Sequence, residues 1–463
     1  MLPVLTLRLA GFAAAGALAA PAVGARGVAV WNILLVIATA VDWVRTPRPE
    51  RVTVTRAAPA VMTRGTTGEL TWTVHNPIAR PLRVALADDL PRALGAPTRR
   101  AAATVPSGGR TRRSVALHPR RRGRFVLGRI TLRVTGPWGL AARQRWRQMN
   151  DAVTVYPSFP SRTAIELRLR QARQLVPGER TVRQRGTGLD FDSLRDYTVD
   201  DEIRRIDWAA TARSSQAIVR TYRADRNQTV LVLVDCGRTM AALVGATTAH
   251  DRVAPAPTEP DAPSPTPDRA APADEPIARL EHAIDAAQGI TRLATGMGDR
   301  VGLVAYADRV LATLPPRNQA DQLRQVTAAL AATGPHLLES DHAGAFAATL
   351  RRFPRRALLL VLTELANEAA VQTLLPALGL LRRRHLVVVG SVRDPVVERW
   401  RLEPSDTVEQ VYRRAAAIRT LEQRAATATR LRAAGATVVD ALPGDLASAV
   451  ADTYLDTKAA GRL

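Results

Sequence analysis

The pattern of apolar and polar positions opens with two nearly continuous apolar stretches, residues 4–24 and 27–44. Arg8 interrupts the first stretch, and Asn32 and Asp42 interrupt the second. Each is close to the roughly 20 apolar residues that cross a bilayer core as a helix. The short connection Gly24-Ala25-Arg26-Gly27 allows only a tight turn between them. We therefore expect a transmembrane helical hairpin over residues 1–48.

The charges around these stretches predict the orientation of the hairpin. Arg45, Arg48 and Arg51 follow the second stretch directly. Because basic residues accumulate on the cytoplasmic side of membranes, we expect a multi-pass cell-membrane protein whose bulk lies in the cytoplasm. In the alternative, Ala17-Leu18-Ala19 is a cleavage site and the first stretch is a secretory signal. The absence of charge before Arg8 favours the hairpin.

The next region, residues 49–160, alternates apolar and polar positions with a period of two, which is typical of half-buried strands. Turn signals such as Asn76-Pro77 and Gly136-Pro137 separate the segments. His75 and His118 have no second ligand within reach in the sequence. We expect a β-sandwich, immunoglobulin-like in its strand spacing, that serves as a spacer or docking module. Its predicted strands are residues 51–55, 69–74, 82–86, 113–117, 124–128, 130–134 and 152–156.

The last region, residues 228–463, alternates short apolar strands with helical patterns. This order indicates a parallel sheet covered by helices on both faces. The predicted strands are 230–235, 300–306, 357–363, 386–390 and 437–440, and the predicted helices are 277–294, 319–332, 343–352, 368–384 and 408–434. Ligands of such sheets bind beyond the carboxyl ends of the strands, where Asp235 and Glu364 fall. Residues 248–276, rich in Pro, Ala and Asp, are predicted to be a disordered insertion.

Composition narrows the functional classes. The chain has 65 Lys and Arg residues and a formal net charge of +23. Lys458 is the single lysine, and the arginines are spread through the chain among acidic residues, which argues against nucleic-acid binding. The single cysteine, Cys236, excludes an intramolecular disulfide. The neighbouring Asp235 carboxylate disfavours the thiolate and so raises the pKa of the Cys236 thiol. Because the thiolate is the reactive form, we do not expect Cys236 to be reactive.

A dense set of acids and arginines fills the segment 161–227 between the two folded regions. We interpret these charges as an ion-pair network that fixes a loop and a short helix over residues 201–213. Asp200 or Asp201 would cap this helix and Trp208 would be a buried anchor. Paired carboxylates also suit acid–base work, so a carboxylate-based hydrolase is the alternative. The residues that we expect to have a structural role are Arg195, Asp196, Tyr197, Asp201, Arg205, Asp207, Trp208 and Arg213.

The same segment carries a family resemblance. Gly188, residues 193–197 (Ser-Leu-Arg-Asp-Tyr), Asp200-Asp201, residues 203–208 and Ala212-Arg213 resemble the signature of the domain-of-unknown-function 58 (DUF58) family. Residues 121–128 and 135–140 are similar to that family's upstream strands. The resemblance implies a membrane-anchored protein with a von Willebrand factor A-like C-terminal domain. It also implies a MoxR-type AAA+ ATPase as partner, in a chaperone-like or envelope-related role.

A von Willebrand factor A-like domain commonly binds a divalent cation, which makes Asp235, Thr239 and Glu364 candidate Mg²⁺ ligands. Such sites commonly contain an Asp-x-Ser-x-Ser motif together with a Thr and an Asp from later loops. These side chains supply the hard oxygen ligands that Mg²⁺ prefers. Here Gly237 has no oxygen in the middle position, residues 339–341 lie where a threonine is expected, and Glu364 is one methylene longer than aspartate. The alternative is that Asp235 caps the turn that follows it.

The function that these features favour is non-enzymatic. The sequence lacks a Walker-type Gly-rich loop, a His-Glu-x-x-His motif and a Gly-x-Ser-x-Gly motif. We expect a membrane-anchored interaction or scaffold protein that acts with a MoxR-type AAA+ ATPase, and with other membrane proteins, in assembly or remodelling of envelope-associated proteins. A cation-dependent adhesion or binding protein and a carboxylate-based hydrolase are the alternatives.

Overall fold

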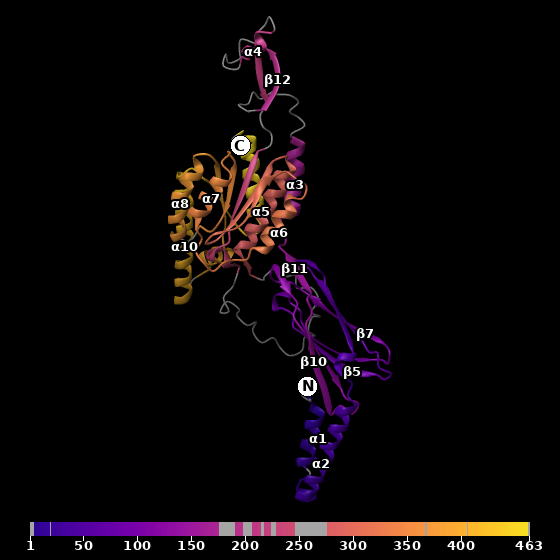
Figure 1. Ribbon diagram of the computed structural model, residues 1–463. Coiled ribbons are helices and arrows are strands. Elements are labelled where there is room, and N and C mark those ends of the chain that lie inside the picture. The colour runs from indigo at the N-terminus through magenta and orange to yellow at the C-terminus, as the bar shows by residue number, and fades with distance from the viewer. Residues whose placement is uncertain are drawn as a thin grey trace. The chain divides into compact units, whose positions relative to one another are not determined.

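The computed structural model of the chain describes residues 4–18, 20–175, 190–197, 206–213, 217–223, 228–245, 276–365, 368–404 and 406–461. The chain forms two compact units, Met1–Ser158 and Phe159–Leu463. The predicted boundaries at residues 48, 160 and 227 are finer than this division and stay predictions. Each unit is described by itself below (Figure 1).

The first unit begins with a helical hairpin. A short strand, β1 (Val4–Leu5), leads into helix α1 (Leu7–Leu18), and α2 (Ala20–Arg45) follows with a reversal at Gly24 (φ 66°, ψ 174°). The two helices lie side by side (Figure 1). Gly16 leaves room for the Trp31 ring, whose Nε1 donates a hydrogen bond to the Phe12 carbonyl at 3.1 Å. Small residues allow such close approach between helices.

One helical stretch of the described chain, Gly24–Arg51, is long and apolar enough to cross a membrane. The expectation of two such helices is met only in part, because α1 has 12 residues and a length of roughly 18 Å at 1.5 Å per residue. The structure therefore supports an N-terminal apolar hairpin with one full-length span.

Three sheets form the rest of the first unit, in a sandwich-like arrangement. Their strand orders are β1-β10-β9-β5-β6, β2-β4-β7 and β3-β11-β8. All seven predicted strands are present. The strands β3, β6 and β10 were not predicted; half of the β6 residues are alanine, and most of the β10 residues are polar. The strands are β2 (Thr53–Ala57), β3 (Val61–Thr63), β4 (Gly68–His75), β5 (Leu82–Asp88), β6 (Arg100–Val105), β7 (Arg110–Leu117), β8 (Gly123–Val126), β9 (Ile130–Thr135), β10 (Ala141–Arg147) and β11 (Ala152–Tyr156), with 3₁₀ turns at Pro49–Arg51 and Arg92–Leu94.

A buried ion pair joins these sheets. Arg56 of β2 donates to Asp88 of β5 at 2.6 Å, and neither side chain has any solvent exposure. Trp72 Nε1 donates to the other Asp88 oxygen at 2.7 Å, and Arg56 Nε donates to Asp151, just before β11, at 2.9 Å. Because an unpaired charge at this depth is strongly unfavourable, the three sheets are held in one arrangement that satisfies both groups.

The second unit contains a six-stranded sheet in the order β18-β17-β14-β19-β20-β21. All five strands predicted from continuous apolar runs are present and parallel: β14 (Thr229–Asp235), β17 (Arg300–Tyr306), β19 (Leu358–Leu362), β20 (Leu386–Val392) and β21 (Thr437–Ala441). The edge strand β18 (Val310–Arg317) was not predicted and runs antiparallel to β17. The sheet is therefore mixed, not purely parallel.

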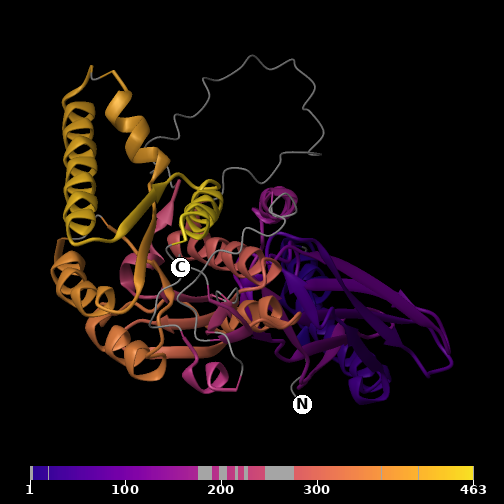
Figure 2. The same cartoon turned by 90° about the horizontal axis from the view of Figure 1, so that it is seen from above.

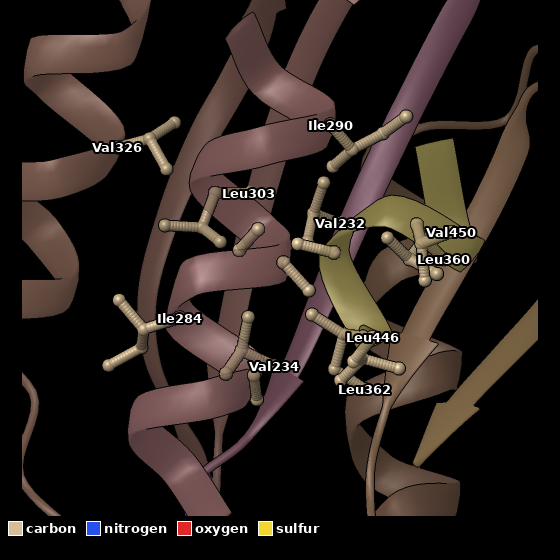
Figure 3. Close-up of a cluster of buried hydrophobic side chains, with 14 of the residues drawn as sticks. Val232, Val234, Ile284, Ile290, Leu303, Val326, Leu360, Leu362, Leu446 and Val450 are labelled. Carbon is tan, nitrogen blue, oxygen red and sulfur yellow. The ribbon is translucent and has the colours of Figure 1, made fainter. Parts of the chain in front are cut away.

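Helices cover both faces of this sheet (Figures 1 and 2). Alternate residues of β14 point to opposite faces: Val230, Val232 and Val234 enter one buried cluster, and Leu231 and Leu233 enter the other. The first cluster includes α3 (Arg162–Leu175), α5 (Arg279–Gly296), α6 (Gln322–Ala332) and α11 (Leu446–Ala459), and the second includes α7 (His342–Arg352), α8 (Glu368–Arg382) and α10 (Val408–Ala433). Figure 3 shows the first cluster, in which Val232 and Val234 lie beside Ile284 and Ile290 of α5. A further helix, α9 (Pro395–Leu402), precedes α10.

The segment between the two folded regions differs from its prediction. Its described part is the hairpin β12 (Asp190–Asp196) with β13 (Ile218–Arg223), and a single turn of helix, α4 (Trp208–Thr211). Asp207 caps this turn by accepting from the Ala210 amide at 3.1 Å. This turn lies within the predicted helix 201–213, but the prediction that Trp208 is a buried anchor is wrong: one turn buries little surface, and Trp208 is 68% exposed. Residues 201–205 and 248–275, the remaining part of that helix and most of the expected insertion, lie outside the described residues.

We predict that Arg56→Met lowers the stability of the first unit by about 3–5 kcal/mol, because it leaves the Asp88 carboxylate buried without a cation. Urea unfolding of the detergent-solubilised full chain, followed by tryptophan fluorescence, measures the change. Arg145→Met is the matched control. It breaks an ion pair with Glu50 in which Arg145 is 57% exposed, and should cost at most about 1 kcal/mol. Equal losses in the two variants would contradict the role given to Arg56.

Candidate functional site at the carboxyl edge of the sheet

The candidate site lies where the sheet reverses its direction of winding. β14 is paired with β17 on one side and with β19 on the other. The chain therefore leaves β14 toward one edge of the sheet and returns later on the opposite side. Ligands of open α/β sheets bind at such a switch point, outside the carboxyl ends of the strands. Asp235 ends β14 here, and Thr363 follows the last residue of β19.

Asp235 is the centre of this site and is 1% exposed. Its Oδ2 accepts a hydrogen bond from the Thr363 hydroxyl at 2.6 Å. Its Oδ1 accepts from the Ser340 hydroxyl and from the Gly237 amide, the latter at 2.8 Å. The contact with Gly237 is the turn cap expected from the sequence. The two hydroxyls are additional, and they come from segments distant in the sequence.

Gly237 makes room for the Ser340 hydroxyl. A Cβ atom at residue 237 would lie 2.0 Å from Ser340 Oγ and 3.1 Å from the Leu338 carbonyl oxygen. The Gly237 backbone is extended (φ −77°, ψ −173°), so space and not backbone strain requires glycine here. The oxygen that the metal motif would place at residue 237 is thus supplied to Asp235 by Ser340 instead.

Backbone hydrogen bonds hold the loop that carries Ser340. The His336 amide donates to the Cys236 carbonyl at 2.7 Å, and the Asp341 amide donates to the Ala307 carbonyl at 2.8 Å. Asp341 also caps α7 by accepting from the Gly344 amide. Within this fixed loop, Leu337 and Leu338 are 75% and 57% exposed. The loop therefore presents apolar side chains to solvent beside Asp235.

Glu364, the other predicted carboxylate ligand, is held by arginines. Its side chain is 2% exposed and pairs with Arg279 of α5 at 2.8 Å and with Arg424 of α10. Burial lowers the pKa of Arg424, but Glu364 and Asp440 outweigh that effect and raise it above its ordinary value. Arg424 Nη2 also donates to Asp440 at 2.6 Å. Two guanidinium groups thus supply the positive charge that the Glu364 carboxylate needs.

The space beside these groups is small. A cavity of about 10 Å³ lies between Thr363, Glu364 and Ser391, room for no more than one water molecule. A larger hollow of about 400 Å³ lies elsewhere, between β18 and the end of α7 near Phe353. The cavity at these carboxylates is therefore too small for a small-molecule substrate.

Tyr306 and His342 form a neutral pair among the groups near Asp235. The Tyr306 hydroxyl lies 3.1 Å from His342 Nδ1, and both side chains are buried. Burial lowers the pKa of His342 and raises that of Tyr306, and the Asp235 charge raises the pKa of both. Burial prevails for His342, so both rings are uncharged near neutral pH and act as packing groups.

The structure brings together some of the predicted residues and not others. Asp235 lies with Thr363 and Ser340, whereas the Glu364 carboxylate is engaged by arginines, and Thr239 is half-buried in a 3₁₀ turn, Arg238–Ala241. No group of three or more His, Cys, Asp and Glu side chains suited to a metal occurs among the described residues. The Mg²⁺ site with Asp235, Thr239 and Glu364 stays a prediction.

The described signature residues belong to the hairpin of β12 and β13 and to the region around α4. Arg195 and Asp196 belong to β12, the Tyr197 amide donates to the Ala217 carbonyl at 2.8 Å, and Arg213 is exposed. Asp201 and Arg205 lie outside the described residues. The expected ion-pair network among these side chains stays a prediction.

Sequence reasoning missed the roles of Arg279, Arg424 and Ser340. Arg424 carried a usable signal, because it interrupts the buried face of α10 that includes Ala417, Ala428 and Leu431. An arginine on a buried helix face requires an acidic partner.

Comparisons with known proteins agree with part of the resemblance. The family model described as "Protein of unknown function DUF58" matches residues 193–256 and 274–430. The "Uncharacterized protein YeaD" of Bacillus subtilis (strain 168) is 25% identical over 114 residues, which cover 25% of this chain and 28% of that relative. The match thus spans little more than a quarter of the relative's length.

Solved structures resemble short parts of the chain. The CARDB domain of the PF1109 protein from Pyrococcus furiosus, in complex with di-metal ions, has a TM-score of 0.15 at 15% identity and covers 22% of this chain and 86% of that one. The cupredoxin domain of amoB from Nitrosocaldus yellowstonii has a TM-score of 0.17 at 8% identity, over 24% and 89% of the two chains. Scores this low carry no argument about the fold or the function.

We predict that Gly237→Ala lowers the stability of the second unit by about 1–3 kcal/mol, because its methyl group collides with the Ser340 hydroxyl. Ser340→Ala alone should cost about 1 kcal/mol, the value of one hydrogen bond. The double variant Gly237→Ala/Ser340→Ala should be more stable than Gly237→Ala alone, since the collision is removed. Thermal unfolding of the four proteins gives the coupling energy, and strictly additive effects would show that the two positions do not compete for the same space.

Proposed function

We propose that the chain is a membrane-anchored, non-enzymatic protein of the DUF58 family whose second unit binds a protein partner at the carboxyl edge of its sheet. In this proposal a MoxR-type AAA+ ATPase is the partner, and the pair assembles or remodels envelope-associated proteins. The family match supports membership because it includes part of the signature segment and most of the second unit.

The proposal rests on the hydrogen-bond and ion-pair partners of the two buried carboxylates at the switch point. Asp235 is satisfied by hydroxyls and an amide, and Glu364 by two guanidinium groups. The cavity beside them holds no more than one water molecule, too small for the substrate that acid–base catalysis requires. What this edge offers instead is a fixed loop with exposed Leu337 and Leu338, a surface suited to another protein.

A von Willebrand factor A-like fold is part of the same proposal. The sheet with helices on both faces, and an aspartate at the end of its first strand, supports it. Asp235 in such a fold marks the face that contacts partners. The exposed loop over residues 336–341 would then set which partner is bound.

The membrane anchor is the other part of the proposal. Large apolar side chains of the hairpin, including Leu18, Ile33, Val36 and Val44, are more than half exposed, as expected of side chains that contact lipid. We propose that α1 and α2 both lie in the membrane, with the bulk of the chain on the cytoplasmic side next to Arg45 and Arg48.

Crosslinking in the native membrane followed by mass spectrometry tests the partnership. We expect an AAA+ ATPase among the crosslinked proteins, and about tenfold less of it with Leu337→Ser/Leu338→Ser, the loss that corresponds to about 1.4 kcal/mol of binding free energy. Leu380→Ser/Leu402→Ser is the matched control, because those leucines are 50% and 68% exposed on α8 and α9. Consistent absence of an AAA+ ATPase would overturn the partnership, and equal loss in both variants would overturn the binding face.

A cation-dependent binding protein is the second candidate, because Asp235 and the hydroxyls of Ser340 and Thr363 converge. One carboxylate and two hydroxyls are hard oxygen ligands that suit Mg²⁺. The fit is limited, since Glu364 is occupied by Arg279 and Arg424. A bound ion would leave open positions for an oxygen atom of the partner.

This candidate predicts a heat of Mg²⁺ binding by the full chain that Asp235→Ala lacks, measured by isothermal titration calorimetry. Asp321→Ala is the control, because Asp321 is a half-exposed carboxylate just before α6. The next residue, Gln322, donates to the carbonyl of Val301 at the start of β17, which is the opposite edge of the sheet. Identical heats from the wild type and Asp235→Ala would end the metal hypothesis.

A further inference from the structure

A single loop of the first unit is bonded to both ends of the helical hairpin. This loop, residues 136–141, connects β9 to β10. The Thr6 hydroxyl, just before α1, donates to the Gly139 carbonyl at 2.6 Å. Asp42, near the end of α2, is fully buried and accepts hydrogen bonds from the amides of Trp138, Leu140 and Ala141 at 2.8–2.9 Å. The loop is therefore fixed at the level where both helices end.

Tryptophan and arginine side chains surround this point. The Arg45 guanidinium lies 5.6 Å from the ring centre of Trp138, and the Arg143 guanidinium lies 4.5 Å from that of Trp43. We call these four residues the collar. Trp138 is 47% exposed and Arg45 is also exposed, whereas Trp43 and Arg143 are half-buried, so the collar is open to solvent on the side of Trp138 and Arg45.

The length of α2 places the collar at the edge of a bilayer. From the reversal at Gly24 to Trp43 the helix has about 20 residues, which span roughly 30 Å, the thickness of a hydrocarbon core. Tryptophan is enriched at the membrane interface, and arginine is enriched just outside it on the cytoplasmic side. Both residue types therefore stand at the depth of lipid headgroups.

The charges of the collar suit an anionic ligand. Asp42 is engaged by three backbone amides, and Glu50 pairs with Arg145. Further arginines lie close by: the Arg8 side chain is 3.2 Å from the position of a Cβ on Gly139, and Arg83 donates to the Pro137 carbonyl at 2.7 Å. A planar guanidinium binds phosphate oxygens in a bidentate manner.

We propose that the collar of Trp43, Arg45, Trp138 and Arg143 binds the phosphate headgroups of anionic lipids in the leaflet where the hairpin ends. The proposal rests on the membrane anchor proposed above. It gives the loop 136–141 a role, since the loop carries Trp138 and, through Asp42, fixes it beside α2. Anionic lipid then holds the first unit against the membrane surface, in addition to the apolar helices.

The test uses the full chain reconstituted with phosphatidylcholine alone or mixed with phosphatidylglycerol. Native mass spectrometry counts the lipids retained after transfer to detergent. We expect the wild type to retain phosphatidylglycerol in preference to phosphatidylcholine. The variant Arg45→Gln/Arg143→Gln should lower the ratio of the two retained lipids about fivefold for each arginine removed. Inorganic phosphate should leave the preference unchanged, because the ligand is a headgroup held at the bilayer and not a free anion.

The matched control is Arg121→Gln/Arg124→Gln. Both arginines are exposed, Arg121 just before β8 and Arg124 within it. Leu127, just after β8, is joined through Arg56 to Asp88, at the end of β5 remote from the loop. The control should keep the full preference. A second readout that does not depend on charge is fluorescence quenching by lipids brominated near the headgroup, which Trp138→Phe should reduce.

Flotation on a density gradient separates the possible failures. If the chain floats with both kinds of vesicle but retains the two lipids equally, or if the control loses as much preference as the collar variant, the collar proposal is overturned and the anchor stands. If the chain floats with neither, the anchor is overturned and the collar proposal with it.

Discussion

The hydrogen bonds of the Asp235 carboxylate decide the geometry of the second unit at its switch point. A carboxylate that is 1% exposed has lost its hydration and must be satisfied by the protein. Thr363 satisfies one oxygen and thereby ties the end of β19 to β14. Ser340 and the Gly237 amide satisfy the other, which ties the loop 336–341 to the same point. Strand ends and loop are therefore interdependent, and the exposed leucines of the loop have a fixed position because of it.

Glu364 shows a second solution to the same problem, one residue beyond Thr363. Its carboxylate is compensated by Arg279 and Arg424, charges that arrive from helices on either face of the sheet. A metal site would bring several carboxylates around one cation. In this chain Asp235 and Glu364 instead have separate partners. The proposal of a protein-binding surface at this edge rests on this separation.

In the first unit, two buried carboxylates likewise join separate elements. Asp88, with Arg56 and Trp72, joins the sheets of the sandwich-like part. Asp42 joins the end of an apolar helix to a loop of the β region through three backbone amides. A buried carboxylate without partners is costly, and at the end of α2 the three amides of the loop supply the hydrogen bonds that water would otherwise make.

Elements whose signal is local can be predicted from the sequence alone. The continuous apolar runs of β14, β17, β19, β20 and β21 identify buried strands, because strands covered on both faces have no polar side, and the paired apolar stretches identify the hairpin. The strands β18 and β10 were missed for the converse reason: they carry polar or half-exposed residues, and pairing with a neighbour, not apolar burial, makes them strands. Trp208 was misjudged because helical spacing says nothing about whether a partner surface exists.

Which side chains come into contact depends on the fold. Ser340 and Asp235 are 105 residues apart, Thr363 and Asp235 are 128 apart, and Trp138 and Asp42 are 96 apart. No local pattern encodes such contacts, because they depend on strand order and on where a loop returns to the sheet. The sequence placed Asp235 and Glu364 at strand ends, and the fold determined that one is bound by hydroxyls and the other by arginines, since side-chain direction and burial are set by the packed neighbours.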